Sequence, residues 1–175
     1  MGFAKVFTPL EGIAPLARVA QTLRGREFVV VAPAAHASDA QNLAPHALAY
    51  AFNDETERGM AWSLRCAMAR IPAGRDIGIL LADMPWVTRE TLARVETLLG
   101  PAVDVAYPVD ESDTPGHPVI FSARCRARLE SLPEGDTLRI ARDDPSLRRA
   151  SAVLGDRGAF IDLDTPSDWH APRRA

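Results

Sequence analysis

The chain has 175 residues, a formal net charge of −3 at pH 7, 47% hydrophobic residues and 25% charged residues. This composition is that of an ordinary globular protein, and the length predicts one domain. The acidic balance argues against a nucleic-acid-binding protein, which needs a basic face for phosphates. The two cysteines, Cys66 and Cys125, form no zinc or redox motif. No segment has the length of a membrane span or the pattern of a signal peptide, so we expect a cytoplasmic protein without a membrane partner.

Helices and short apolar strands are predicted in alternation along the chain. Pro15 suits the first turn of a helix, and Gly25 follows its end. Apolar runs such as 28–32 and 77–82 are typical of strands buried on both faces of a parallel sheet. Thr88 is the expected N-cap of a later helix. The expected helices cover 15–23, a short segment within 34–50, 58–70, 88–99, 122–132, 137–142 and 166–169, and the expected strands cover 28–32, 47–52, 77–82, 103–107, 118–121, 153–154 and 160–161.

This alternation predicts an α/β fold with three α/β/α layers and a mainly parallel, Rossmann-like sheet. We expect residues 1–170 to form a single domain and residues 171–175 to form a loose tail. In such folds, ligands bind outside the carboxyl ends of the strands. The residues that follow each strand are therefore the first candidates for a functional site.

Asp83 directly follows the apolar run 77–82, and Pro85 fixes the turn after it. A carboxylate in this position can hold Mg²⁺, which binds one or two carboxylates together with water and substrate phosphates. The alternative is that Asp83 caps the next helix, but Thr88 is better placed for that role. We therefore interpret Asp83 as a metal ligand.

Four other residues have both a chemical and an ordinary structural interpretation. Asp164 ends an expected late strand and is either a second carboxylate facing the crevice or a helix cap. Gly59 can let the backbone approach a ligand at a helix start, with Ser63 one turn further, although the same pattern fits a plain amphipathic helix. His117 follows a polar loop and is a candidate phosphate ligand or general acid, whereas a lone histidine is more often a structural hydrogen-bonding group.

The start of the chain contains an unusual basic residue. Of the 20 basic residues, 19 are arginine, and Lys5 is the single lysine. Lysine is a compact point charge and arginine a planar fork, so the two are not interchangeable at a tight phosphate site. Lys5 is thus a candidate for contact with phosphate.

Together, these motifs resemble the MobA-like nucleotidyltransferases, and most closely the branch that makes the cytidylyl form of the molybdenum cofactor. The resemblance covers about residues 1–170. It rests on four motifs in the family's order: Gly59-Met60 with Ser63-Leu64-Arg65, then Ala82-Asp83-Met84-Pro85, then Gly116-His117-Pro118-Val119-Ile120-Phe121, then Asp162-Leu163-Asp164-Thr165-Pro166 with Asp168.

The resemblance also exposes a gap at the start of the chain. Residues 1–5 match only the last part of the family's glycine-rich loop, so the family's first strand and most of its phosphate-binding loop have no counterpart here. A sheet without that strand would have unpaired hydrogen-bonding edges. Two explanations are open: the true start lies upstream of Met1, or the chain is short and catalytically weakened.

The resemblance implies a nucleotide-diphospho-sugar transferase type of fold and Mg²⁺-dependent transfer of a nucleotide from a triphosphate, CTP being favoured, to a phosphorylated acceptor. Asp83 and Asp164 would hold the metal, Lys5 and Asp83 would be catalytic, and Gly2, Lys5, Gly59 and Ser63 would bind the nucleotide. His117 would lie near the acceptor.

The implied acceptor is molybdopterin, and the implied protein partner is a molybdoenzyme or its chaperone. The family usually has a Gly-Asp-x-Gly-Ala-Arg run near residues 134–139. In this chain only Gly135, Asp136 and Arg139 match that run, which puts the identity of the acceptor in doubt. The alternatives are a weakly active or inactive accessory protein that binds a nucleotide or cofactor, and a sugar-phosphate nucleotidyltransferase.

Overall fold

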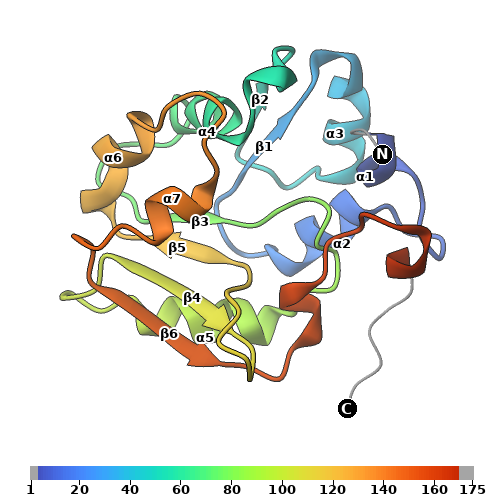
Figure 1. Ribbon diagram of the computed structural model, residues 1–175. Coiled ribbons are helices and arrows are strands. Elements are labelled where there is room, and N and C mark those ends of the chain that lie inside the picture. The colour runs from blue at the N-terminus through green and yellow to red at the C-terminus, as the bar shows by residue number, and fades with distance from the viewer. Residues whose placement is uncertain (1–3, 170–175) are drawn as a thin grey trace.

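The computed structural model describes residues 4–169, and it consists of two sheets covered by helices (Figure 1). Gly2 and the expected tail at 171–175 lie outside the described residues. The strands are β1 Val29–Ala32, β2 Ala49–Phe52, β3 Ile77–Ile79, β4 Val105–Val109, β5 Val119–Phe121 and β6 Arg149–Val153. The α-helices are α1 Ala4–Phe7, α2 Pro15–Thr22, α3 Ala37–Leu43, α4 Met60–Met68, α5 Arg89–Leu98, α6 Arg126–Glu130 and α7 Leu138–Arg142.

The larger sheet has the strand order β3-β5-β4-β6. Strands β4 and β6 pair in parallel, and β5 pairs antiparallel with both β3 and β4. Three of these four strands therefore run in one direction, in agreement with the expected mainly parallel sheet. Strand β5 reverses because the polar loop between β4 and β5 contains no helix to carry the chain back for a parallel crossover.

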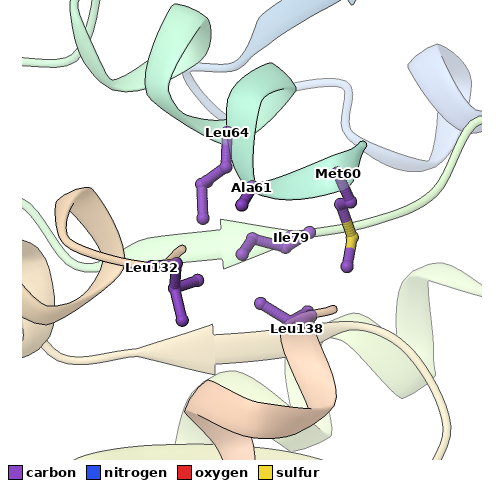
Figure 2. A pocket seen from close by; sticks show the side chains of 6 residues that line it. All are labelled: Met60, Ala61, Leu64, Ile79, Leu132 and Leu138. Carbon is purple, nitrogen blue, oxygen red and sulfur yellow. The ribbon is translucent and has the colours of Figure 1, made fainter. Parts of the chain in front are cut away.

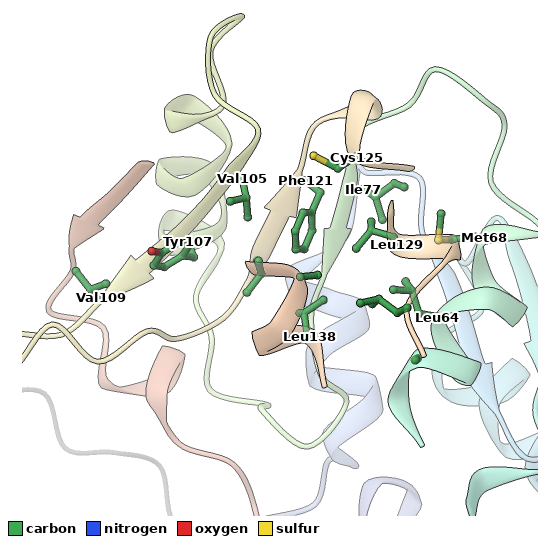
Figure 3. Packing of buried hydrophobic residues seen from close by; sticks show 14 residues of the cluster. Leu64, Met68, Ile77, Val105, Tyr107, Val109, Phe121, Cys125, Leu129 and Leu138 are labelled. Carbon is green, nitrogen blue, oxygen red and sulfur yellow. The ribbon is translucent and has the colours of Figure 1, made fainter. Parts of the chain in front are cut away.

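Alternating side chains of the larger sheet build two separate cores, which gives the three layers. Val105 and Phe121 point to a core shared with α4, α6 and α7 (Figure 3). Ala106 and Ile120 point to the opposite face, where they pack against α5. Because successive strand residues face opposite sides, both faces need a helical cover, and the expected α/β/α arrangement is confirmed.

The smaller sheet contains only β1 and β2, which pair in parallel. Within residues 4–169, β1 pairs with β2 alone and β3 pairs with β5 alone, so each is the edge of its own sheet. Gly78, in the middle of β3, is exposed although its neighbours in sequence are apolar. Within the described residues, β1 and β3 therefore each have one edge that pairs with no other strand.

Several predicted boundaries are corrected by the structure. The expected strand 77–82 ends at Ile79, and the late strand expected at 153–154 is β6, which begins earlier at Arg149. The strand expected at 160–161 is wrong, because Phe160 closes a 3₁₀ helix that begins at Arg157. The segment 166–169 is a single 3₁₀ turn.

Helix α5 begins as predicted. The Thr88 side chain accepts a hydrogen bond from the backbone N–H of Thr91 at 3.1 Å, and Asp156 accepts from the backbone N–H of Thr88 at 3.0 Å. The start of α5 is thus capped without Asp83, whose carboxylate is left for another partner. No helix within residues 4–169 has the length and apolar character needed to cross a membrane.

Candidate active site

Three charged side chains from distant parts of the chain meet beyond the carboxyl end of β3. The Lys5 Nζ atom lies 3.1 Å from Asp83 Oδ2 and 3.0 Å from Asp164 Oδ1. The two carboxylates therefore converge on one point and share one cation. The structure brings together the two residues predicted to bind metal and the lysine predicted to bind phosphate.

Helix α1 fixes the position of Lys5. Val6 is buried, and the Phe7 ring stacks on the His36 ring with the centroids 4.4 Å apart. These contacts leave the Lys5 side chain only 10% exposed. Burial alone would lower the pKa of Lys5, but the hydrogen bonds from its ammonium to Asp164 and Asp83 raise that pKa above its ordinary value. Lys5 is therefore a positive charge throughout the physiological pH range.

The segment that carries Asp164 is tied directly to the turn that carries Asp83. The backbone N–H of Leu163 donates to the Asp83 carbonyl oxygen at 2.9 Å, and the Leu163 side chain is fully buried. Asp162 and Asp164, on either side of Leu163, are both exposed. Of the two, the structure places Asp164 against Lys5, and its role at the site does not depend on the strand that was expected before it.

Gly116 allows the same C-terminal segment to approach the strands closely. A Cβ atom at this position would lie 2.3 Å from the Ala159 carbonyl oxygen and 2.6 Å from carbons of the Phe160 ring. The neighbouring backbone N–H of His117 donates to that carbonyl oxygen at 2.8 Å. Glycine is needed here because any side chain would displace the segment that leads to Asp164.

Replacing Gly116 with alanine should destabilise the fold by about 1–3 kcal/mol, the usual range for overpacking. Gly155→Ala is the matched control, because a Cβ at Gly155 meets nothing within 4 Å. Urea unfolding of both variants measures the difference. Equal midpoints would show that the close approach at Gly116 is not required.

His117 lies at the end of β3, where its Nδ1 atom is 3.3 Å from the Ile79 carbonyl oxygen. A carbonyl can only accept, so Nδ1 carries the proton and Nε2 has a free lone pair. Burial lowers the pKa of His117, although the Ile79 carbonyl and the charge of Asp83 oppose this effect. At neutral pH the ring is therefore uncharged, which favours hydrogen bonding over an ionic contact with phosphate.

The lowered pKa of His117 predicts a pH effect on stability. An unfolded histidine binds a proton near pH 6.5, whereas the folded one binds it at lower pH, so stability falls as the pH drops below about 6.5. The slope is at most about 1.4 kcal/mol per pH unit for one group. Thermal unfolding of wild type and His117→Gln between pH 7.5 and 5.5 should show a smaller loss in the variant; parallel curves would contradict the buried neutral ring.

The start of α4 is the predicted nucleotide segment, and it contacts residues 134–135. Gly59 has a positive φ of 81°, and a Cβ there would lie 3.3 Å from the Gly135 Cα atom. The Gly135 N–H donates to the Arg58 carbonyl oxygen at 3.1 Å. Arg58 forms ion pairs with Glu55 and Glu134. These contacts hold residues 134–135, which belong to the run that departs from the family's pattern, against the predicted nucleotide segment.

An apolar hollow lies beside this contact (Figure 2). Met60 at the start of α4 and Ile79 at the end of β3 both line it, which places the nucleotide segment close to the Ile79 carbonyl that His117 contacts. Its lining is apolar, so it does not suit a triphosphate. The lining residues are Met60, Ala61, Leu64, Ile79, Leu132 and Leu138.

Sequence reasoning missed Asn53, which is buried directly after β2. Its Nδ2 atom lies 2.8 Å from Ser63 Oγ, so it contacts a residue that was predicted to bind nucleotide. The signal was available, because Asn53 follows a strand at its carboxyl end, where ligand-binding residues gather in α/β folds.

The oxygen chemistry of the site fits a divalent cation. Carboxylate oxygens are the ligands that Mg²⁺ and Mn²⁺ prefer, and two carboxylates with substrate phosphates are a usual Mg²⁺ set. Among residues 4–169 there is no cluster of three or more histidine, cysteine, aspartate or glutamate side chains suited to a metal. The protein would thus contribute two ligands, Asp83 and Asp164.

Comparison with protein families decides what kind of protein has this site. The model of the MobA-like NTP transferase domain matches residues 1–151. The chain belongs to the MobA-like NTP transferase family. It is accordingly a nucleotidyltransferase, whose substrates are a nucleoside triphosphate and an acceptor. No curated protein matches the sequence.

Solved structures with the same fold extend over nearly the whole chain. Rv0371c from Mycobacterium tuberculosis H37Rv is 25% identical with a TM-score of 0.73, over 97% of this chain and 88% of that chain. A complex of Rv0371c with manganese is 23% identical with a TM-score of 0.70, over 94% of this chain and 88% of that chain. The 4-diphosphocytidyl-2C-methyl-D-erythritol synthase is 18% identical with a TM-score of 0.74, over 94% of this chain and 91% of that chain.

Proposed function

We propose that this MobA-like protein transfers a nucleoside monophosphate from CTP to a phosphorylated small molecule in an Mg²⁺-dependent reaction. The observation that carries the proposal is the convergence of Asp83 and Asp164 on Lys5 Nζ. A metal–triphosphate complex carries both positive and negative charge. The two carboxylates can bind its metal ion, and the lysine ammonium can bind its phosphate oxygens.

In this reaction an acceptor phosphate oxygen attacks the α-phosphorus, and the bond from that phosphorus to the β-bridging oxygen breaks. Pyrophosphate leaves with the electron pair of that bond. Such chemistry needs mainly positioning and charge neutralisation from the protein. Bound Mg²⁺ would neutralise phosphate charge and make the α-phosphorus more electrophilic.

The chain's own residues would divide the remaining work. Asp83 and Asp164 would hold the cation, and Lys5 would move from the carboxylates to the triphosphate oxygens. Gly59 and Ser63 would place the base or the ribose. His117, neutral and with a free Nε2 lone pair, would hydrogen-bond the acceptor.

The choice of CTP and the choice of a divalent cation are each supported by one structural relative. The name of one structural relative contains a diphosphocytidyl group, which makes CTP the first nucleotide to test. A manganese complex exists for another relative, which supports a divalent cation. Molybdopterin is the acceptor we propose from the sequence motifs, together with a molybdoenzyme or its chaperone as the protein partner.

Pyrophosphate release with CTP, GTP, UTP and ATP in Mg²⁺ tests the function, with a phosphorylated acceptor supplied. We expect release that requires both the metal and the acceptor, with CTP the best substrate. Nucleotide binding without any release would favour the accessory-protein alternative. Release with sugar phosphates but not with molybdopterin would favour a sugar-phosphate nucleotidyltransferase.

A further inference from the structure

Asn53 is a buried polar side chain at the point where β2 ends, with only 3% of its surface exposed. Its backbone N–H donates to the Ala32 carbonyl oxygen at 2.9 Å, which ties it to the end of β1. Burial of an amide is costly unless its polar atoms are paired, so the partners of this side chain fix its orientation.

The orientation of the Asn53 amide follows from one hydrogen bond. The backbone N–H of Glu55 lies 2.9 Å from Asn53 Oδ1, and an N–H can only donate. The oxygen therefore faces Glu55, and the NH₂ group faces Ser63 Oγ at 2.8 Å. Consequently the Ser63 hydroxyl accepts from Asn53.

A hydroxyl that accepts one hydrogen bond still has its own proton to donate. Among residues 4–169, the structure assigns no acceptor to the Ser63 proton. Ser63 is half-buried in the first turn of α4, just after the positive-φ residue Gly59. The proton is thus available to a ligand at the predicted nucleotide segment.

We infer that Asn53 is a positioning residue that makes Ser63 a hydrogen-bond donor toward the nucleotide. The inference rests on the proposed function and names the chemistry of one contact: the ligand atom opposite Ser63 is a hydrogen-bond acceptor. That acceptor belongs either to the base, where cytosine, uracil and guanine have a carbonyl that adenine lacks, or to the ribose or triphosphate, which all four nucleotides share.

Calorimetric titration of the protein with CTP, UTP, GTP and ATP tests the donor itself. Ser63→Ala should weaken binding about tenfold, the effect of one hydrogen bond of this kind, and Ser63→Thr, which keeps the hydroxyl, should stay within about threefold of wild type. A loss limited to CTP, UTP and GTP identifies a base carbonyl. An equal loss with all four identifies an acceptor on the ribose or the triphosphate. Unchanged affinity in Ser63→Ala overturns the inference.

Asn53→Asp tests the positioning role, because a carboxylate can only accept, and Ser63 must then turn its proton toward it. We expect about tenfold weaker CTP binding in the Ser63 background and less than about twofold in the Ser63→Ala background. An equal loss in both backgrounds would mean that the added charge or a structural defect is responsible, which overturns the inference. Thermal unfolding of each variant gives its stability separately.

Nucleotide binding by the wild-type protein separates a failure of the proposed function from a failure of this inference. A wild-type protein that binds none of the four triphosphates contradicts the proposed function and this inference together. A wild-type protein that binds them, with no dependence on the Ser63 hydroxyl, contradicts this inference alone.

Discussion

Asp83→Asn should lower the rate of nucleotidyl transfer by about 10³-fold or more while the protein remains folded. Asparagine keeps the shape of the side chain but removes the negative charge that would hold the divalent cation. The fold should tolerate the change, because the Asp83 side chain is partly exposed and the cap of α5 does not use it. Steady-state pyrophosphate release and urea unfolding give the two readouts.

Asp162→Asn is the matched control for this experiment. Asp162 belongs to the same motif as Asp164 and is also exposed, but Lys5 pairs with Asp83 and Asp164. We expect its rate to stay within about twofold of wild type, because Asp162 is exposed and its charge is only a minor influence on His117. If Asp83→Asn retains full metal-dependent release, Asp83 is not a ligand of the catalytic metal.

Lys5→Met should change metal binding and catalysis in opposite directions. The Lys5 ammonium now stands between the two carboxylates, where a divalent cation would bind. Removing it leaves two neighbouring negative charges without a counter-ion, so Mn²⁺ should bind about tenfold more tightly in the absence of nucleotide. Turnover should nevertheless fall about 10²-fold, because the charge that neutralises the triphosphate is lost.

Lys5→Arg is the control, because it keeps the positive charge in a bulkier, planar form. It should show no gain in Mn²⁺ affinity, while its turnover reports how much the compact ammonium matters. Titration calorimetry with Mn²⁺ alone measures the binding. Unchanged or weaker Mn²⁺ binding in Lys5→Met would show that Lys5 and the metal do not share the place between the carboxylates.

Most of the architecture could be predicted because apolar runs and caps are local signals. The pattern at 103–107 and the cap at Thr88 both led to elements that the structure contains. The end of β3 was placed too late because the run 77–82 is apolar throughout. Pairing with β5 stops at Ile79, and no second neighbour continues the strand within the described residues.

The wrong prediction of a strand at 160–161 has a physical explanation. Phe160 and Ile161 form an apolar pair that suits either a strand or a buried turn, and periodicity cannot separate the two over so few residues. The hydrogen bond from the Gly158 N–H to Asp156 at 3.0 Å favours the turn. The turn therefore depends on the polar side chain of Asp156, and a pattern of hydrophobic residues contains no information about such a contact.

The candidate site was predictable to the extent that it follows from strand ends. Asp83 was found because it follows a clear apolar run, Asp164 because it ends an expected strand, and Lys5 because it is the single lysine; the resemblance to the family then implied their metal-binding and catalytic roles. Their meeting depends on contacts between distant segments, such as the hydrogen bond from Leu163 to Asp83, which no local pattern contains. The hydrogen bond between Asn53 and Ser63 could not be predicted for the same reason, because it joins two different elements of the fold.

The central claim is that Asp83 and Asp164 hold one divalent cation at the triphosphate. Anomalous diffraction from crystals of the protein grown with Mn²⁺ and CTP measures this directly. The account predicts one manganese peak between the two carboxylates, in contact with phosphate oxygens, and Lys5 turned toward the phosphates. A manganese peak away from both carboxylates, or nucleotide phosphates bound elsewhere with the three side chains still joined to one another, would contradict it.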